Sequence, residues 1–351
     1  MKRRGRPAAL RDHRLAALRN HRLAALLAGA ALLCAGRVRV PFGESLFFTG
    51  AEAPLPVARD CERCHQEVYR EWEDSLHARA WRSEAFQHAT SSGRAEECLG
   101  CHAPGPLVAG EPPSLRNAHR EEGVTCTSCH LAPGAAGARL AMRGPVARSS
   151  PVEVHPVIEE DPTYRSSELC GTCHRGALAE WERAAAPEDG EKETCQGCHM
   201  PAVHRKVESV HEEHAYSRLF VALERSEDLR RHAFAVPEDA AEHVDVTAER
   251  DGPTRVRVTL GNRLPHALPT GSFGRRQLAV AASWSGGERQ TLVVDAPARA
   301  LATGEVRSVT LELPPEARGL PLRVELRRFE HARGGWSAIA AAAVPRAPAH
   351  E

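Results

Sequence analysis

The sequence predicts two parts of different fold class, a mainly α-helical and irregular part followed by an all-β, immunoglobulin-like sandwich. Two observations predict this division. Ten of the eleven cysteines lie between residues 61 and 198, and none follows residue 198. After residue 237 the chain changes to short runs in which apolar and polar residues alternate, which is the pattern of strands with one buried face.

The composition is typical of a globular chain and excludes a polytopic membrane protein or a disordered one. The 351 residues include 46 basic and 46 acidic side chains, but residues 1–36 hold eight of the basic ones and only one acidic one. The rest carries 38 basic and 45 acidic groups, a balance that argues against nucleic acid as a partner. Aromatic residues make up only 5%, so another apolar group is expected to fill part of the interior.

Residues 1–36 have the pattern of an export signal. An arginine-rich stretch precedes an apolar run of fourteen residues, LAALLAGAALLCAG, at positions 23–36. As a helix this run rises about 21 Å, less than the roughly 30 Å hydrocarbon core of a bilayer. The pattern is typical of a secretory signal peptide, with an uncleaved N-terminal anchor as the alternative. We therefore expect a protein of the periplasm or the cell-surface side of the membrane, associated with the membrane only through this segment.

One spacing, Cys-x-x-Cys-His, accounts for all ten of these cysteines. Two thiols one helical turn apart can bond to the two vinyl groups of one haem, and the adjacent histidine then lies under the iron as its proximal ligand. Zinc sites, thioredoxin-like pairs and disulfide frameworks also use paired cysteines, but none needs a histidine after every second cysteine. We therefore predict five c-type haems, with iron as the metal. The motifs are Cys61-Glu-Arg-Cys64-His65, Cys98-Leu-Gly-Cys101-His102, Cys126-Thr-Ser-Cys129-His130, Cys170-Gly-Thr-Cys173-His174 and Cys195-Gln-Gly-Cys198-His199.

Residues 37–239 are predicted to form a pentahaem cytochrome c domain. The five motifs lie between residues 61 and 199, a stretch too short to bury a separate core of side chains around each haem. The porphyrins are therefore expected to pack on one another and to supply the apolar interior. Such packing would bring them close enough for electrons to pass between them.

Each iron has a second axial position, for which histidine and methionine are the usual ligands. Beyond residue 1 only Met142 and Met200 are available, whereas twelve histidines lie outside residues 1–36 and the motifs, so bis-His ligation is the default expectation. His77 is expected to serve the first haem, because it follows the first motif on a segment of helical character, residues 66–90. Further candidates are His88, His119, His155, His204, His211, His214 and His232, the last on an expected helix over residues 223–235.

Residues 240–346 are predicted to form the β-sandwich domain. About seven short strands separated by Gly, Pro, Asp and Asn match the immunoglobulin-like pattern. A turn-rich loop at residues 262–271 displays His266, which is either an ordinary loop residue or a ligand that reaches back to a haem. The expected strands are residues 244–247, 255–260, 277–284, 290–294, 306–313, 322–329 and 337–344.

From residue 61 to about residue 280 the chain resembles the periplasmic multihaem cytochromes c related to the tetrahaem cytochrome that accepts electrons from hydroxylamine oxidoreductase. The resemblance implies electron transfer and, carried over, His77, His214 and His266 as distal ligands. In some relatives one haem is five-coordinate and binds small ligands. The matching phrases are Trp72-Glu-Asp-Ser75-Leu-His77-Ala78, Glu122-Gly-Val124-Thr-Cys126, Ser167-Glu-Leu-Cys170-Gly-Thr-Cys173-His174, the Cys195-to-Pro201 segment and Asn262…His266…Pro269-Thr270-Gly271.

Two functions follow from these patterns. The favoured one is electron transfer through mostly bis-His haems, with redox partner proteins or quinol-linked electron donors as partners. The alternative is an oxidoreductase with one open haem that acts on a small nitrogen or sulfur compound. No catalytic residue is assigned, because the sequence places no acid–base pair beside an open haem.

Overall fold

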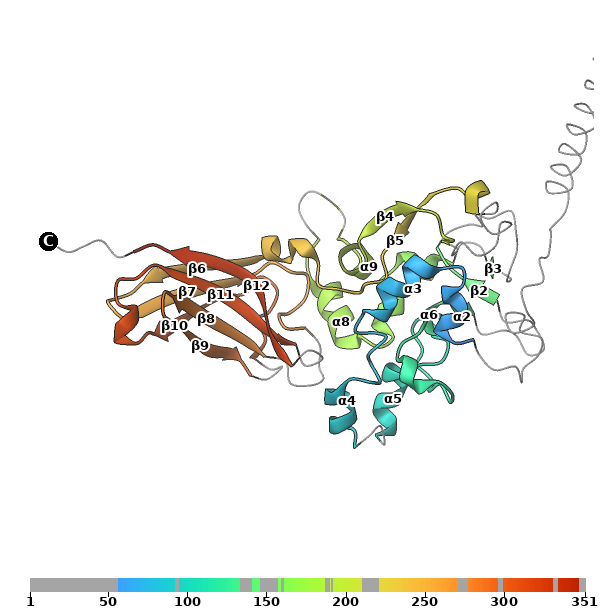
Figure 1. Cartoon of the computed structure of the whole chain (residues 1–351), viewed down its shortest axis with the longest axis horizontal. Coiled ribbons are helices and arrows are strands. Elements are labelled where there is room, and N and C mark those ends of the chain that lie inside the picture. Colours follow the sequence, from blue (N-terminus) through green and yellow to red (C-terminus); the bar gives the residue numbers. More distant parts are fainter. Residues whose placement is uncertain are drawn as a thin grey trace, which may run out of the picture.

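The computed structural model describes residues 56–91, 95–132, 141–145, 157–158, 161–186, 190, 192–209, 221–270, 277–295, 299–330 and 334–346. These form a motif region, residues 56–236, and a β region, residues 244–346, which lie next to each other along the long axis of the molecule (Figure 1). The expected signal segment at residues 1–36 lies outside the described residues. Among the helices that are described, none is both long and apolar enough to cross a membrane.

Short helices joined by loops make up most of the motif region. The helices are α2 (Ala58–Glu62), α3 (Gln66–Glu73), α4 (Glu84–Ala89), α5 (Glu96–His102), α6 (Cys126–His130), α7 (Glu168–Gly171), α8 (Arg175–Arg183) and α9 (Cys195–His199). The buried apolar cluster here is small, consisting of Ala58, Tyr69, Trp72 and Ala78. The other buried apolar side chains of the region, such as Leu99 and Leu169, lie outside this cluster. A core this divided is weak for a region of this size, which fits an interior completed by another group.

The expected helix over residues 66–90 is interrupted between α3 and α4. The carbonyl oxygen of His77 accepts the N–H of Ala80 at 3.1 Å and the N–H of Val124, from a distant segment, at 3.0 Å. α4 then begins anew, with Ser83 Oγ accepting the N–H of Phe86 at 3.3 Å. A tertiary backbone contact therefore overrides the helical character of the sequence.

The expected helix over residues 223–235 is replaced by a strand. β5 (Glu227–Arg230) pairs antiparallel with β4 (Ala202–Arg205), with Val203 opposite Leu229. The pairing satisfies the backbone groups of both segments, which a short helix standing alone would do less well. A second small sheet combines β1 (Leu131–Ala132), β2 (Ala141–Arg143) and β3 (Val157–Ile158).

The described residues of the β region form seven strands in two antiparallel sheets. One sheet has the order β10-β7-β6 and the other β12-β11-β8-β9. Each of the seven predicted segments overlaps one observed strand, so these predictions are confirmed. The strands are β6 (Val244–Arg250), β7 (Arg255–Asn262), β8 (Leu278–Trp284), β9 (Gly287–Val294), β10 (Val306–Glu312), β11 (Leu322–Glu330) and β12 (Gly335–Val344).

One apolar core joins the two sheets. Val256, Val258 and Leu260 of β7 are fully buried and alternate with more exposed residues, as expected for a strand with one inner face. They belong to the same cluster as Val280 of β8 and Leu326 of β11, which lie in the other sheet. The shared core supplies the β region with hydrophobic stabilisation of its own.

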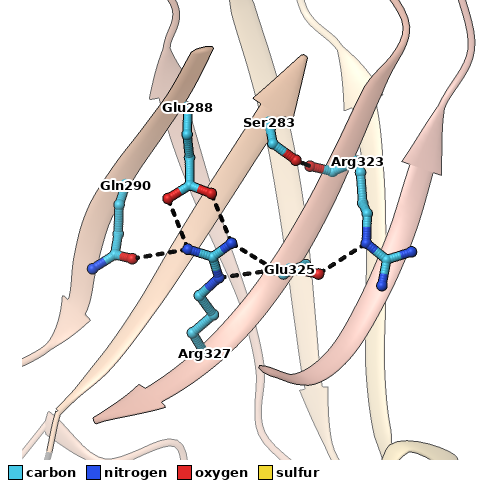
Figure 2. Close-up of polar contacts among 6 residues, drawn as sticks. All are labelled: Ser283, Glu288, Gln290, Arg323, Glu325 and Arg327. Atoms are coloured by element: carbon cyan, nitrogen blue, oxygen red, sulfur yellow. Dashed lines mark hydrogen bonds and ion pairs between the residues drawn. The ribbon is translucent and has the colours of Figure 1, made fainter. Parts of the chain in front are cut away.

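The outer face of the larger sheet carries a charged network. Arg327 of β11 donates to both carboxylate oxygens of Glu288 on β9, each at 2.7 Å, and to Glu325 at 2.9 Å (Figure 2). Arg323 donates to the other oxygen of Glu325 at 2.8 Å. These side chains alternate along β11 with buried apolar residues, so the sheet is polar on one face and apolar on the other.

Candidate haem sites

All five Cys-x-x-Cys-His motifs form a turn of helix. α6 and α9 each consist of one whole motif, and α5 ends with another. In the remaining two, the N–H of His65 donates to Cys61 O at 2.8 Å and the N–H of His174 to Cys170 O at 2.9 Å. The ten cysteines are free thiols. Two free thiols one turn apart, followed by a histidine, are the groups that covalent attachment of a haem requires.

Backbone carbonyl groups orient four of the motif histidines. The Nδ1–O distances are 3.0 Å from His65 to Val207, 2.7 Å from His102 to Ala80, 2.9 Å from His130 to Arg143 and 2.9 Å from His199 to Ala235. Because a carbonyl oxygen only accepts, Nδ1 must carry the proton. The lone pair of Nε2 is then left for a metal, which is the usual arrangement of a metal-bound histidine.

Three motif histidines face a second histidine from a distant part of the chain. The ring centres are 6.1 Å apart for His77 and His174, 5.9 Å for His130 and His232, and 6.3 Å for His199 and His266. A metal–nitrogen bond of about 2 Å on each side, plus about 1 Å from that nitrogen to the ring centre, gives a separation of about 6 Å. The three pairs therefore fit an iron held between two imidazoles.

Burial keeps the second histidine of each pair neutral. Burial, assisted by the neighbouring His174 and His232, lowers the pKa of His77 to about 3. Burial also lowers the pKa of His232 to about 3, and it is the main reason why the pKa of His266 is lowered. Neutral imidazole is the form that binds a metal, so these rings are in the protonation state that ligation needs.

The motifs adjoin one another through their thiols. The thiols of Cys61 and Cys126, of Cys101 and Cys173, and of Cys170 and Cys195 lie close enough to shift one another's pKa. Cys129 is also near enough to contribute to the raised pKa of both Cys170 and Cys173. The first motif thus lies beside the third, and the fourth lies near the second, third and fifth. Haems attached to these cysteines would have their edges close together.

The second motif has an aromatic neighbour. The ring of His102 lies nearly parallel to that of Phe86, with centres 4.0 Å apart and planes at 14°. Trp81 lies beside Phe86, with ring centres 5.7 Å apart. Within the described residues, no second histidine makes a ring contact with His102. The second site therefore differs from the three sites with paired histidines.

His77 faces the fourth motif, not the first motif that precedes it in the chain. In the turn after α3 the backbone of His77 packs against Gly123. Gly123 has a φ of 64°, and a Cβ atom there would lie 2.4 Å from the carbonyl oxygen of His77. Only glycine permits this approach, so Gly123 helps to fix the backbone that carries His77.

The other candidate ligands fall into three groups: those that face a motif, those that are exposed, and those outside the described residues. His266 lies in the expected loop and faces the fifth motif, and His232 faces the third. His88, His119 and His204 are exposed, and His204 Nδ1 lies 2.9 Å from Asp228. His155, His211 and His214 lie outside the described residues. No local pattern distinguishes His232 from the other histidines that follow the fifth motif, so the sequence could nominate it but not select it.

Part of the sequence is similar to known cytochromes c. The family model for cytochrome c554 and c-prime matches residues 60–131. Cytochrome c-554 of Nitrosomonas europaea is 28% identical over 117 residues, which are 30% of this chain and 48% of that protein, so the match spans about half of the relative's length. The crystal structure of a penta-heme cytochrome c552 from Thermochromatium tepidum has a TM-score of 0.49 at 16% identity, covering 82% of this chain and 98% of that one.

The helical Cys-x-x-Cys-His turns and their oriented histidines define a c-type cytochrome, whose cofactor is haem c. The family match and the curated relative confirm the resemblance seen in the motifs. Over the residues that these comparisons match, the chain is similar to multihaem c-type cytochromes, which are electron-transfer proteins in general.

Proposed function

We propose that this protein carries electrons through five covalently bound c-type haems, most of them ligated by two histidines. The thioethers would form at the ten motif cysteines, and His65, His102, His130, His174 and His199 would be the proximal ligands. His77, His232 and His266 would be the distal ligands of the fourth, third and fifth haems. His214 remains the predicted distal ligand for a further haem.

The observation that carries this proposal is the pairing of histidines at about 6 Å. In each of the three pairs one ring belongs to a motif and the other comes from a distant segment. Two imidazoles that close both axial positions leave the iron no site for a substrate, so such a haem accepts and donates electrons without binding one. Three closed sites favour electron transfer over catalysis as the main function.

The contacts between motifs support a continuous path for electrons. Each motif adjoins at least one other, and the thiols of Cys61 and Cys126 illustrate how close the attachment points come. Since haems lie over their attachment cysteines, neighbouring porphyrin edges would be separated by little more than the side chains that anchor them. The electrons would come from redox partner proteins or quinol-linked donors.

The proposal includes an exported protein with two domains. The basic and apolar pattern of residues 1–36 supports export to the periplasm or the cell-surface side of the membrane. The separate core of the β region supports a division into residues 37–239 and 240–346. The immunoglobulin-like class is supported by the division of strands, because the first, second and fifth share one sheet and the third, sixth and seventh share the other. The fourth strand, β9, joins the second sheet, which differs from the constant-type arrangement.

Two measurements on the purified, oxidised protein test this function. A pyridine haemochrome assay divided by protein concentration should give five haems per chain, and a value of three or fewer would reject the assignment of the motifs. Electron paramagnetic resonance should show at least three low-spin irons per chain. A spectrum dominated by high-spin iron would refute bis-His ligation.

A second candidate function rests on the surroundings of His102. None of the described histidines makes a ring contact with His102, whereas three other motif histidines each face one. A haem bound at the second motif could therefore keep an open position and act on a small nitrogen or sulfur compound. Carbon monoxide binding to one haem per reduced chain of the unaltered protein would favour this function, and its absence would oppose it.

A further inference from the structure

A Glu-Trp pair occurs at the same distance after two of the motifs. Glu71 and Trp72 follow His65 by six and seven residues, and Glu180 and Trp181 follow His174 by the same intervals. Both pairs lie on the helix that continues from the motif, α3 in the first case and α8 in the second. Adjacent residues of a helix point about 100° apart, so the two side chains of a pair reach different segments of the chain.

Each tryptophan is hydrogen-bonded to the backbone just before another motif. Trp72 Nε1 donates to the carbonyl oxygen of Val124 at 2.7 Å, and Trp181 Nε1 donates to that of Glu193 at 2.8 Å. Val124 stands two residues before Cys126, and Glu193 stands two residues before Cys195. The two indoles therefore anchor equivalent positions, just ahead of the third and the fifth motif.

Both glutamates hold the segment that carries a distal histidine. Glu71 Oε2 accepts the N–H of His232 itself at 2.9 Å. Glu180 Oε2 accepts the N–H of Ala267, the residue after His266, at 2.9 Å and the hydroxyl of Thr270 at 2.9 Å. Hydrogen bonds to a carboxylate are stronger than those between neutral groups, so they suit a role in fixing a backbone.

The two contacts of each pair meet at one site. The third motif, approached by Trp72, is the one whose His130 faces His232, the residue bound by Glu71. The fifth motif, approached by Trp181, is the one whose His199 faces His266, beside the residue bound by Glu180. The same construction thus occurs twice, at sites built from different segments, which argues against a chance contact.

We propose that the Glu71–Trp72 and Glu180–Trp181 pairs are positioning residues that set the separation of the two axial histidines at the third and fifth haems. In each pair, the indole binds the segment that leads to the proximal histidine, and the carboxylate binds the segment that carries the distal histidine. The haem of one motif would thus be framed by the helix that follows another motif. This inference rests on the proposed bis-His ligation of these haems.

The test uses the full-length, haem-loaded protein and concentrates on Glu180. Four variants are compared with the unaltered chain: Glu180→Ala, Glu180→Gln, Glu182→Ala and His266→Ala. Glu182 lies two residues further along α8 and is exposed, so its alanine variant is the matched control. The readouts are the spin state of the oxidised irons, carbon monoxide bound per reduced chain, and the circular dichroism of the β region, which checks folding.

The expected results follow from the hydrogen bonds. His266→Ala should add one high-spin iron and one carbon monoxide site per chain. Glu180→Ala should keep five covalent haems and raise the apparent affinity of the fifth haem for carbon monoxide about tenfold, because His266 then competes less well by roughly the value of one such hydrogen bond. Glu180→Gln keeps an acceptor oxygen without the charge and should restore most of the original affinity, and Glu182→Ala should leave the affinity unchanged.

Two results would overturn the inference in distinguishable ways. If Glu180→Ala binds carbon monoxide as the unaltered protein does while His266→Ala opens a site, positioning by Glu180 is wrong and the ligand assignment stands. If His266→Ala itself changes no spectrum, the proposed ligation of the fifth haem is wrong, and the positioning role fails with it. A Glu180→Gln variant as impaired as Glu180→Ala would also contradict a role as hydrogen-bond acceptor.

Discussion

Destabilising the core of the β region should open the fifth haem while leaving the other four unaffected. The perturbation is Leu326→Ala on β11, at a side chain with no exposed surface in the core shared by both sheets. The connection to the haem runs through the loop that carries His266. Asn262, at the end of β7, donates to His266 O at 3.0 Å and to Leu301 O at 2.9 Å. When the sheets melt, these two hydrogen bonds are lost, and Glu180 alone is left to hold the loop of His266 opposite the fifth motif.

The magnitude follows from the burial of Leu326. Truncating a fully buried leucine to alanine in a well-packed core costs about 3 kcal/mol of unfolding free energy, within a range of roughly 2 to 5 kcal/mol. For a folding unit of about 100 residues, an unfolding entropy of about 2.1 cal/mol/K per residue converts 3 kcal/mol into a fall in Tm of about 14 °C.

The assay follows two signals in one thermal scan. Circular dichroism of the strands reports on the β region, and the high-spin absorption band reports on an iron that has lost a ligand. Both transitions should fall together, by about 14 °C, in Leu326→Ala. Leu292→Ala is the matched control, since Leu292 is 51% exposed on β9 and its loss should change stability by less than about 0.5 kcal/mol. A high-spin transition that stays in place while the strands melt earlier would refute the coupling.

Three further predictions concern the other parts of the molecule. His77→Ala should convert one low-spin iron, that of the fourth motif, to high-spin, and an unchanged electron paramagnetic resonance spectrum would show that His77 is no ligand. Arg327→Met should lower the unfolding free energy of the β region by about 1 kcal/mol, measured by urea titration near neutral pH. Hydrogen bonds from the arginines lower the pKa of Glu325, so this contribution is present above the carboxyl's usual pKa and is lost as pH falls through the lowered value; a difference that grew in acid would contradict the ion pair. Expressed without haem attachment, the β region alone should fold with a β-type circular dichroism spectrum, whereas the motif region should be degraded, and a stable haem-free motif region would oppose a haem-filled interior.

The strands were predictable because each is governed by a local rule. Val256, Val258 and Leu260 show the alternation directly, and one buried face is sufficient to impose it. The haem motifs were predictable for a similar reason, since both thiols and the histidine of a site lie within five consecutive residues.

The pairing of histidines follows no local rule. His77 stands near His65 in the chain, yet it faces His174, and Gly123 helps to fix the backbone that carries it. His232 lies beyond a strand that the sequence suggests as helix, because pairing with β4 decides the conformation there. Which imidazole faces which motif is therefore settled by contacts between segments about seventy to one hundred residues apart.

The fourth motif lies beside three other motifs. Cys173 lies near Cys101 of the second motif and Cys170 near Cys195 of the fifth, and both lie near Cys129 of the third. In the proposed chain of haems this arrangement is a branched circuit, in which the first, second and fifth haems are terminals. Loss of a terminal haem would leave the other four connected. Loss of the fourth haem would separate the second haem, the fifth haem and the pair of the first and third haems from one another. In such a branched arrangement, an electron that enters at one terminal haem can leave from either of the other two.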